Sequence, residues 1–305
     1  MKKLLLIDGN AIVHRAFHAL PPFHTSKGEM TNAVFGFSSM LLTVISRLNP
    51  DYLLVAFDKK GKTFRDDLYT EYKATRVKAP QTLYDQIPRI KQVVEAFNIP
   101  IFEEGGFEAD DVIGTLATQA SSTGEVESYI ATGDMDALQL VGDHVFVVSP
   151  HKGFQNQIVF GKDQVFEKYG FAPNRLVDYK GLKGDSSDNI PGVKGIGDKT
   201  AVELIKEYGD LEGIYENLEH IRPTVREKLT SQKELAFLSK KLGTIVTDMD
   251  IKLDIEACKT HTFEKEKIQE IFRELEFKSL LVRIESFDKM YTAAKNEDSG
   301  QQKLF

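Results

Sequence analysis

Nine carboxylates in five short motifs constrain this chain more than any other feature, because each motif falls where a loop should leave a strand or open a helix. The motifs are LLLIDGN, LLVAFD, FEADD, TGDMD and GDSSDN, and their acids are Asp8, Asp58, Glu108, Asp110, Asp111, Asp134, Asp136, Asp185 and Asp188. Gathered in one place, so many acids would repel one another unless cations neutralised them. No Cys or His is interleaved with them, and an all-oxygen ligand set suits Mg²⁺ or Mn²⁺ and argues against zinc. The sequence therefore predicts a metal-dependent enzyme that acts on phosphates.

Each motif also has an ordinary structural explanation. Taken alone, Asp8 and Asp58 are more readily explained as helix caps or loop acids. Adjacent acids such as Asp110 and Asp111 are likewise common at the start of a helix, where the dipole favours negative charge. These explanations would have to hold independently in all five motifs, and the conjunction favours one shared site.

The first half of the chain alternates short apolar runs with helical patterns, which is typical of a parallel sheet covered by helices. We expect strands at Lys3–Ile7, Tyr52–Phe57, near Ile99–Phe102, Ser128–Ala131 and His144–Val148, and helices at Ala33–Leu48, Tyr84–Phe97 and Ala109–Ala120. Ligands of such sheets bind beyond the carboxyl ends of the strands, where Asp8, Asp58 and Asp134 fall. Acids that are distant in sequence can thus converge on one pocket.

The pattern changes at about residue 160, and this change predicts the domain organisation. We expect an α/β core over residues 1–160 and an all-helical subdomain over residues 161–290. Residues 295–305 form a polar tail that we expect to be flexible.

Composition restricts the class of protein. The 305 residues include a single cysteine, Cys258, which excludes a disulfide framework and fits a reducing compartment. No apolar run approaches the roughly 20 residues of a membrane span, so we expect a cytoplasmic protein without membrane contact. The net charge is −7, which argues against nucleic acid at first sight, but without the nine candidate ligands 37 acids face 39 Lys and Arg residues. The balance then becomes +2, and bound metal would make the active face more positive.

Two further segments could contact a phosphate backbone. GVKGIG at Gly192–Gly197 precedes a helical pattern, and its glycines and N–H groups could form an anion nest, although a tight turn between helices explains it equally well. FRDDLYTEYKATRVKAP interleaves aromatic and basic side chains as single-strand binders do, although an amphipathic surface helix is the better explanation of that segment alone. His14 and His18 lie four residues apart without further His or Cys support, so we expect no metal role for them.

These motifs together resemble the 5′ nuclease domain of bacterial family A DNA polymerases and the related stand-alone flap endonucleases. LLLIDGN, VAFD, YKATR, FEADDVIGTLA, TGDMDALQL, GDSSDNIPGVKGIGDKTA and LEFKSLL follow one another in the family's order from about Leu4 to Leu281. The resemblance implies a PIN-like parallel-sheet nuclease core, a helical arch at about residues 59–82, and a helix-three-turn-helix (helix-hairpin-helix) element that binds duplex DNA, often with K⁺. It also implies that all nine acids hold two or three divalent ions.

The same resemblance assigns roles to basic and aromatic residues. It implies that Tyr72, Lys73 and Arg76 act from the arch. The residues expected to contact DNA are Arg15, Arg65, Lys78, Gly192, Val193, Lys194, Gly195, Ile196, Gly197 and Lys199. Met135 departs from the family pattern, because a basic residue is frequent between the two acids of TGDMD.

From this reading we expect a monomeric, structure-specific 5′ nuclease that cleaves DNA near a flap or nick with two metal ions, in primer or flap removal during replication and repair. Two alternatives stay open: a catalytically silent junction-binding module, against which the complete acid set counts, and an RNA-directed nuclease of the same superfamily. The last residues, QQKLF, resemble the bacterial sliding-clamp-binding motif at Gln301, Leu304 and Phe305, although an accidental match or a tail that docks on its own domain would explain them too.

Overall fold

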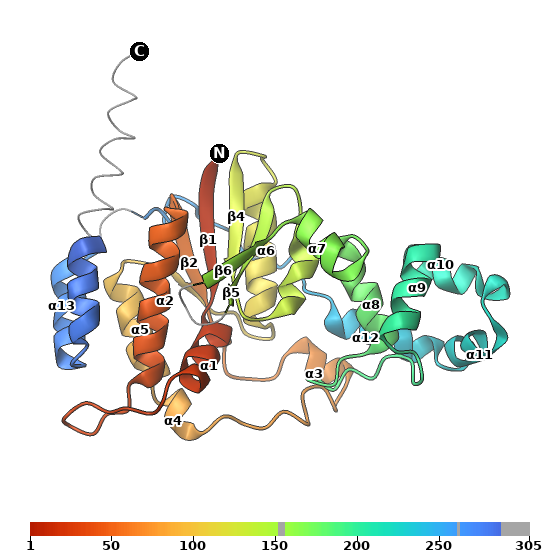
Figure 1. Ribbon diagram of the computed structural model, residues 1–305, viewed down its shortest axis with the longest axis horizontal. Coiled ribbons are helices and arrows are strands. Elements are labelled where there is room, and N and C mark those ends of the chain that lie inside the picture. The colour runs from red at the N-terminus through yellow and green to blue at the C-terminus, as the bar shows by residue number, and fades with distance from the viewer. Residues whose placement is uncertain (152–155, 261–262, 288–305) are drawn as a thin grey trace, which may run out of the picture.

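A six-stranded, mostly parallel sheet forms the centre of the molecule (Figure 1). The computed structural model describes residues 1–151, 156–260 and 263–287. The strands are β1 (Lys2–Asp8), β2 (Tyr52–Ala56), β3 (Ile101–Phe102), β4 (Val126–Ala131), β5 (Val145–His151) and β6 (Asn156–Phe160). Their order is β3-β2-β1-β4-β5-β6, and only β6 runs antiparallel to its neighbour. The central strand β1 therefore has a neighbour on each side, and its carboxyl end opens at the middle of one edge of the sheet.

Both faces of the sheet are covered, which explains why its inner strands read as continuous apolar runs. Leu4 and Leu6 of β1 face a cluster that includes the helix α6 (Ala109–Ser121). Leu5 and Ile7 face the opposite cluster, which includes residues of α1 (Gly9–Ala19), α2 (Asn32–Leu48) and α5 (Ile87–Ala96). Successive side chains of a strand point to opposite faces, so one strand contributes to both cores.

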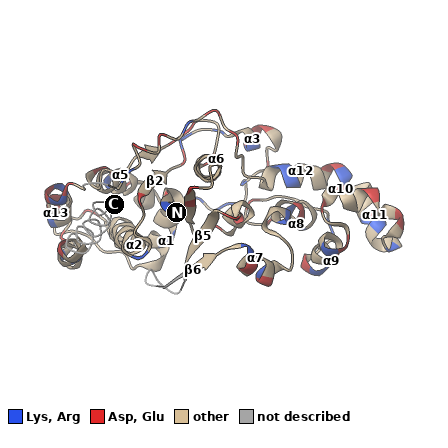
Figure 2. Cartoon of the chain, turned by 90° about the horizontal axis from the view of Figure 1, so that it is seen from above, with Lys and Arg blue, Asp and Glu red and all other residues tan. Residues whose placement is uncertain are grey.

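The other helices fall into two sets. Three short helices lie between strands of the sheet in sequence: α3 (Phe64–Leu68), α4 (Gln81–Tyr84) and η1 (Met135–Leu140). The second half contains α7 (Lys162–Tyr169), η2 (Pro173–Arg175), α8 (Leu176–Lys183), α9 (Asp198–Tyr208), α10 (Leu211–Glu216), η3 (Leu218–His220), α11 (Pro223–Ser231), α12 (Lys233–Gly243) and α13 (Lys265–Glu274). Figures 1 and 2 show α8 to α12 extending from one side of the sheet, whereas α13 lies at the other end of the molecule beside α5.

The expected architecture is confirmed in outline, with several differences. The helix α1 and the strand β6 were not expected, and the helix expected at Tyr84–Phe97 is α5, which begins at Ile87 after the short α4 has ended at Tyr84. Only Phe64–Leu68 of the segment expected to be a helical arch is a helix of more than four residues, and turns and extended chain follow it. Within the stretch expected to form a helical subdomain, Ile268, Phe272 and Phe277 pack in the cluster that contains Leu5 and Ile7.

Candidate active site

Asp8 and Asp58 lie at the carboxyl ends of the neighbouring strands β1 and β2, as the sequence predicts. Asp8 caps α1 by accepting a hydrogen bond from the backbone N–H of Ala11 at 2.9 Å, and it accepts a second from the hydroxyl of Thr132 at 2.7 Å. Asp58 accepts hydrogen bonds from the side-chain amide of Asn10 at 2.6 Å and from a backbone N–H at the start of α6 at 2.8 Å. The capping explanation and the shared-site explanation of Asp8 are therefore both compatible with its place.

Asp134 and Asp136 follow β4 on the other side of β1. Asp134 caps η1, and its carboxylate accepts a hydrogen bond from the backbone N–H of Asp136 at 2.9 Å. Its own backbone N–H donates to Thr132 Oγ1 at 3.0 Å. Thr132 is fully buried and thus links the TGDMD loop to Asp8, a role that we did not predict from the sequence.

Five carboxylates line one cavity of about 230 Å³ at this edge of the sheet. The acids are Asp8, Asp58, Glu108, Asp110 and Asp134, and His14, Lys73 and Arg76 complete the wall. Burial raises the pKa of Asp8 to about 6 against the hydrogen bonds that it accepts, and the neighbouring Asp58 and Asp134 raise it further. Burial, followed by repulsion from Asp8 and Asp134, raises the pKa of Asp110 well above its usual range. The raised pKa values mean that the ionised carboxylates are destabilised in this cavity. A bound cation would stabilise their charged form.

Asp136 and Asp185 form a second acidic group next to the first. The ammonium of Lys180 on α8 bridges them, at 2.8 Å from Asp185 Oδ2 and in direct contact with Asp136. Burial raises the pKa of Asp136 to about 6 despite this cation. Burial also acts to raise the pKa of Asp185, but hydrogen bonds from Lys180 and Ser187 outweigh burial and lower that pKa to about 2. Lys180 was not among the expected site residues, because nothing in the sequence shows which acids it would face.

The expected arch residues contact the acids directly. Lys73 Nζ lies 2.6 Å from Glu108 Oε1, and Arg76 forms an ion pair with Asp188. The hydroxyl of Tyr72 lies 3.2 Å from Glu108 Oε2, and the side chain is only 6% exposed. Tyr72 is therefore turned into the protein and does not present its ring to a passing base in this conformation.

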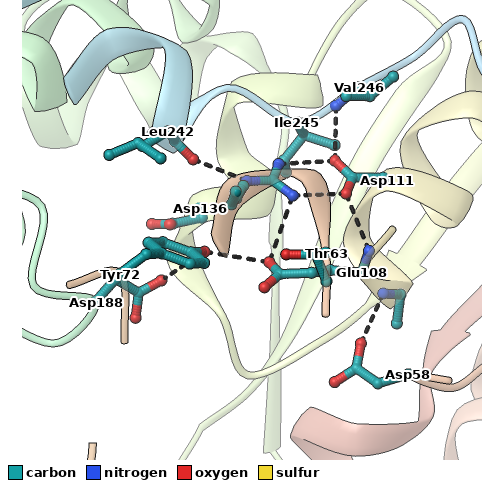
Figure 3. Close-up of polar contacts among 12 residues, drawn as sticks. Asp58, Thr63, Tyr72, Glu108, Asp111, Asp136, Asp188, Leu242, Ile245 and Val246 are labelled. Atoms are coloured by element: carbon teal, nitrogen blue, oxygen red, sulfur yellow. Dashed lines mark hydrogen bonds and ion pairs between the residues drawn. The ribbon is translucent and has the colours of Figure 1, made fainter. Parts of the chain in front are cut away.

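Asp111 differs from the other eight acids. It is fully buried, and both its oxygens accept hydrogen bonds from the guanidinium of Arg65, at 2.6 and 2.8 Å. The backbone N–H groups of Glu108 and Val246 donate to the same carboxylate at 3.1 and 2.8 Å (Figure 3). Arg65 is 2% exposed. These contacts argue against the expectations that Asp111 binds metal and that Arg65 contacts DNA, and the pair instead joins α3 to α6.

The remaining expected DNA contacts lie in three segments of the chain. Arg15 is half-buried on α1, and Lys78 is exposed in the segment that follows Arg76. Lys194 and Lys199 are exposed at the turn Gly192–Gly197 and the start of α9, whereas Val193 and Ile196 are buried. The turn thus offers its backbone and its lysines to a ligand, while its two apolar side chains anchor it to the helices behind.

The fit of divalent cations rests on this donor set. Among the described residues, no three acidic, His or Cys side chains already converge closely enough to hold one ion, and Lys73, Arg76 and Lys180 each pair with an acid. The eight acids other than Asp111 offer only oxygen atoms, which hard divalent cations prefer. Lys168 Nζ lies 3.8 Å from Met135 Sδ, so α7 brings a positive charge to the position where the family pattern places one.

Comparison with known proteins agrees with this geometry. Residues 3–170 match the family model described as the 5′-3′ exonuclease N-terminal resolvase-like domain, and residues 171–266 match the 5′-3′ exonuclease C-terminal SAM fold. The chain belongs to the 5′-3′ exonuclease family. Members of this family are metal-dependent nucleases, and the expected fold class, a PIN-type core followed by a helical region, is confirmed.

Relatives in sequence are of two lengths. A 5′-3′ exonuclease of Aquifex aeolicus is 43% identical over 306 residues and matches along the whole of both chains. DNA polymerase I of Caldicellulosiruptor bescii is 47% identical over 284 residues, which is 92% of this chain and 33% of that protein. DNA polymerase I of Chloroflexus aurantiacus is 48% identical over 279 residues, or 90% and 29%. The chain therefore spans about a third of the length of the polymerases that it matches.

Solved structures share the fold at low sequence identity. T5 5′-exonuclease with bound divalent zinc ions matches with a TM-score of 0.64 at 20% identity, over 95% of this chain and 100% of that chain. The catalytic core of Rad2 in complex with a DNA substrate matches with a TM-score of 0.60 at 14% identity, over 90% and 88%.

Proposed function

We propose that this protein is a structure-specific 5′ nuclease that hydrolyses DNA phosphodiesters at the junction between a 5′ single strand and a duplex. The observation that carries the proposal is the single cavity in which five carboxylates face Lys73 and Arg76. Acids alone would repel a phosphate, and cations alone would only bind it. Together they offer a place for metal ions and a place for the substrate's negative charge.

The eight acids other than Asp111 form the proposed metal site. The acids that would hold ions in the first cavity are Asp8, Asp58, Glu108, Asp110 and Asp134. The acids that would hold ions beside that cavity are Asp136, Asp185 and Asp188. Bound Mg²⁺ or Mn²⁺ would lower the pKa of a water molecule and stabilise charge on the scissile phosphate and the leaving oxygen. The family assignment and the bound zinc ions of T5 5′-exonuclease support divalent metal, and the oxygen donors favour Mg²⁺ or Mn²⁺.

The chain's own cations position the substrate. Lys73 pairs with Glu108 and Arg76 pairs with Asp188, so each would exchange an acid for a phosphate oxygen when metal neutralises that acid. Both cations would then face the scissile phosphate and stabilise its developing charge.

The turn Gly192–Gly197 is the proposed grip on the duplex. Its Gly192 and Gly195 have φ values of 63° and 90°, and a side chain at Gly192 would meet the backbone of Gly184 at 2.3 Å. Glycine is thus required for the bend that leaves Lys194 and the start of α9 exposed. This arrangement suits a phosphodiester backbone, with or without K⁺, and reads no bases.

The decisive experiment is cleavage of a 5′-flap DNA with and without Mg²⁺. We expect cleavage only with the metal, and Asp134→Ala should reduce the single-turnover rate by a factor on the order of 10³ or more. Asp163→Ala, which removes an exposed acid of α7, is the matched control and should cleave normally. Near-normal cleavage by Asp134→Ala would refute the assignment. Faster cleavage of a matched RNA 5′ strand would instead favour an RNA-directed enzyme.

The biological setting follows from the same proposal. We place the protein in the cytoplasm with the chromosome, as a monomer that removes flaps or primers. None of the helices in the described ranges is long and apolar enough to cross a membrane. The proposed clamp contact of Gln301, Leu304 and Phe305 lies outside the described residues. Deleting Gln301–Phe305 should abolish binding to the organism's sliding clamp and leave flap cleavage without the clamp intact.

A further inference from the structure

Helix α12 contacts the proposed duplex grip at its amino-terminal end. Gln232, which caps α12, accepts a hydrogen bond from the backbone N–H of Lys194 at 2.8 Å and donates one to the Lys194 carbonyl at 3.3 Å. About two helical turns further on, the fully buried Ser239 accepts a hydrogen bond from Gly192 N–H at 2.9 Å. The position of the turn Gly192–Gly197 is thus tied to that of α12 at two points.

The other end of α12 contacts the base of the arch. Arg65 donates from Nε to the carbonyl of Leu242 at 2.9 Å and from Nη2 to the carbonyl of Thr244 at 2.7 Å. Its remaining bonds go to Asp111 on α6, and it lies 3.6 Å from Glu108 (Figure 3). One side chain therefore joins the end of α12, the arch and the helix that carries Glu108.

Apolar contacts reinforce the same connection. Tyr72 packs with Leu242 and Ile190 in a small separate cluster, and Tyr69 and Leu238 pack against it. Two leucines of α12 thus belong to the same apolar cluster as two tyrosines of the arch. After α12, Gln139 holds the chain by accepting from Ile245 N–H at 2.9 Å and donating to the Gly243 carbonyl at 3.0 Å.

The joint at Arg65 leaves little freedom of movement. In a buried guanidinium, hydrogen bonds to protein acceptors replace those to water. A shift of α12 that broke these hydrogen bonds would leave the buried charge of Arg65 uncompensated. The 11 residues of α12 form a rigid rod about 16 Å long. A displacement at its Gln232 end must therefore appear at Arg65 or be resisted there.

We propose that α12 is a strut that couples duplex binding at Gly192–Gly197 to the position of the arch, and that Arg65 is the positioning residue at its arch end. This inference rests on the proposed function, because it assigns the turn to the duplex and the arch to the reacting strand. Neither Arg65 nor Gln232 touches the reacting phosphate in this scheme.

A fluorescent reporter tests the coupling without cleavage. The chain contains no Trp, and Val77 is 95% exposed in the arch next to Arg76, so Val77→Trp introduces a single emitter there. A blunt DNA duplex, which has no single strand to enter the arch, is titrated to saturation in EDTA. We expect the emission of the Val77→Trp protein to shift on duplex binding. The added substitution Arg65→Lys, which keeps the charge and loses the planar fork, should abolish that shift. Arg47→Lys, at an exposed position of α2, is the matched control and should retain it.

Cleavage assays give a second readout. With Mg²⁺, Arg65→Lys should lower the preference for a 5′ flap over a single-stranded oligonucleotide by about fivefold or more, whereas general damage to the site would lower both rates equally. The double substitution Gln232→Ala and Ser239→Ala removes both contacts at the opposite end of α12 and should have the same two effects if Arg65→Lys fails to fold.

A shift retained in both variants, or a silent reporter on a protein that binds the duplex, would overturn the strut. A parent protein that fails to bind duplex or to cleave flaps would instead refute the proposed function, and with it the basis of the strut.

Discussion

At the scale of the residue, acids with the same chemistry are held in opposite electrostatic states. Burial and neighbouring acids raise the pKa of Asp8 to about 6, whereas hydrogen bonds from Lys180 and Ser187 lower the pKa of Asp185 to about 2. The ionised form of an acid such as Asp8 therefore lowers the free energy of unfolding, whereas the ionised form of an acid such as Asp185 raises it. Metal ions would relieve acids such as Asp8, so the metal-free protein should reveal the difference.

The raised pKa of Asp8 predicts a dependence of stability on pH. A carboxyl with a higher pKa in the folded than in the unfolded state binds its proton more tightly when folded, so its contribution to the free energy of unfolding falls as pH rises from about 4 to about 6. In EDTA at pH 7, Asp8→Asn should therefore be more stable than the unaltered protein by about 1–3 kcal/mol. Urea denaturation at pH 4 and pH 7 measures this gain, which should vanish near pH 4. Equal stability of the two proteins at pH 7 would contradict it.

Asp111 should behave in the opposite way. Removing it leaves the buried Arg65 without its main partner, so Asp111→Ala should lower the free energy of unfolding by about 3–5 kcal/mol. Asp110→Ala, one position earlier, removes a repelled carboxyl and should leave the metal-free protein as stable as before or more so. Urea denaturation in EDTA compares the two. A stable Asp111→Ala protein that no longer binds metal would restore the ligand role to Asp111.

The sequence could identify the acids of the site but not the neighbours that set their states. The acids at strand ends are Asp8, Asp58 and Asp134. The carboxyl ends of parallel strands lie along one edge of the sheet, and this geometry is enough to bring the three acids together. Thr132 and Lys180 gain their roles from contacts across 124 and 44 positions of sequence, which no local pattern encodes. Arg65 was expected to contact DNA because basic and aromatic side chains interleave in its segment, and no local pattern could indicate that its side chain is buried.

At the scale of the element, the arch is held by contacts rather than by helix propensity. After α3 the chain turns at Lys73, whose φ is 54°, and its backbone N–H donates to the Asp188 carbonyl at 2.9 Å. A continuous amphipathic helix was the alternative for this segment, and its alternating aromatic and basic residues were compatible with either. Asp188 of GDSSDN holds the bent chain at two points, because its carboxylate pairs with Arg76 and its backbone carbonyl accepts from the Lys73 N–H.

The bend predicts a difference between lysines of the arch. Lys73 faces the acidic cavity, so Lys73→Ala should lower the single-turnover rate of flap cleavage at saturating enzyme. Lys60 is exposed at the start of the arch, and Lys60→Ala should weaken DNA binding and flatten its salt dependence without changing the saturated rate. Single-turnover kinetics and binding titrations at two salt concentrations separate these effects. Purely affinity-level losses at both positions would reduce Lys73 to a general phosphate contact.

At the scale of the whole molecule, the chain closes its core with its last described helices. The helical residues 278–287 contribute Leu280 and Ile284 to the cluster on the α2 side of the sheet, and Arg283 donates to Thr43 Oγ1 of α2 at 2.9 Å. The change of pattern near residue 160 suggested a boundary between two units. It marks a change of secondary structure, and it could not reveal that residues after Leu242 cross back to the first half.

This closure predicts a stability effect far from the acids. Phe272 is fully buried and packs 6.0 Å, ring to ring, from Phe277. Phe272→Ala should lower the free energy of unfolding by about 3–5 kcal/mol, and Val282→Ala, at a 66% exposed position, should change it by less than about 0.5 kcal/mol. Urea denaturation checks both, and the folded fraction of Phe272→Ala should still cleave flaps. A loss confined to cleavage would show that this end of the molecule serves the site rather than the core.

Because the last described helices complete the core, the core stays incomplete for most of the protein's synthesis on the ribosome. The apolar faces of α2 and α5 are synthesised early, yet the side chains that cover them arrive only with Phe272, Phe277 and Phe287. Roughly 240 residues separate the end of α2 from Phe287, and at about 5–20 residues per second their synthesis takes about 12 to 48 seconds. Throughout that interval the nascent chain exposes an apolar surface, and for its later part, after Phe160, all six strands of the sheet have already been synthesised. A chaperone at the tunnel exit would therefore meet this chain while the apolar faces of α2 and α5 are still uncovered.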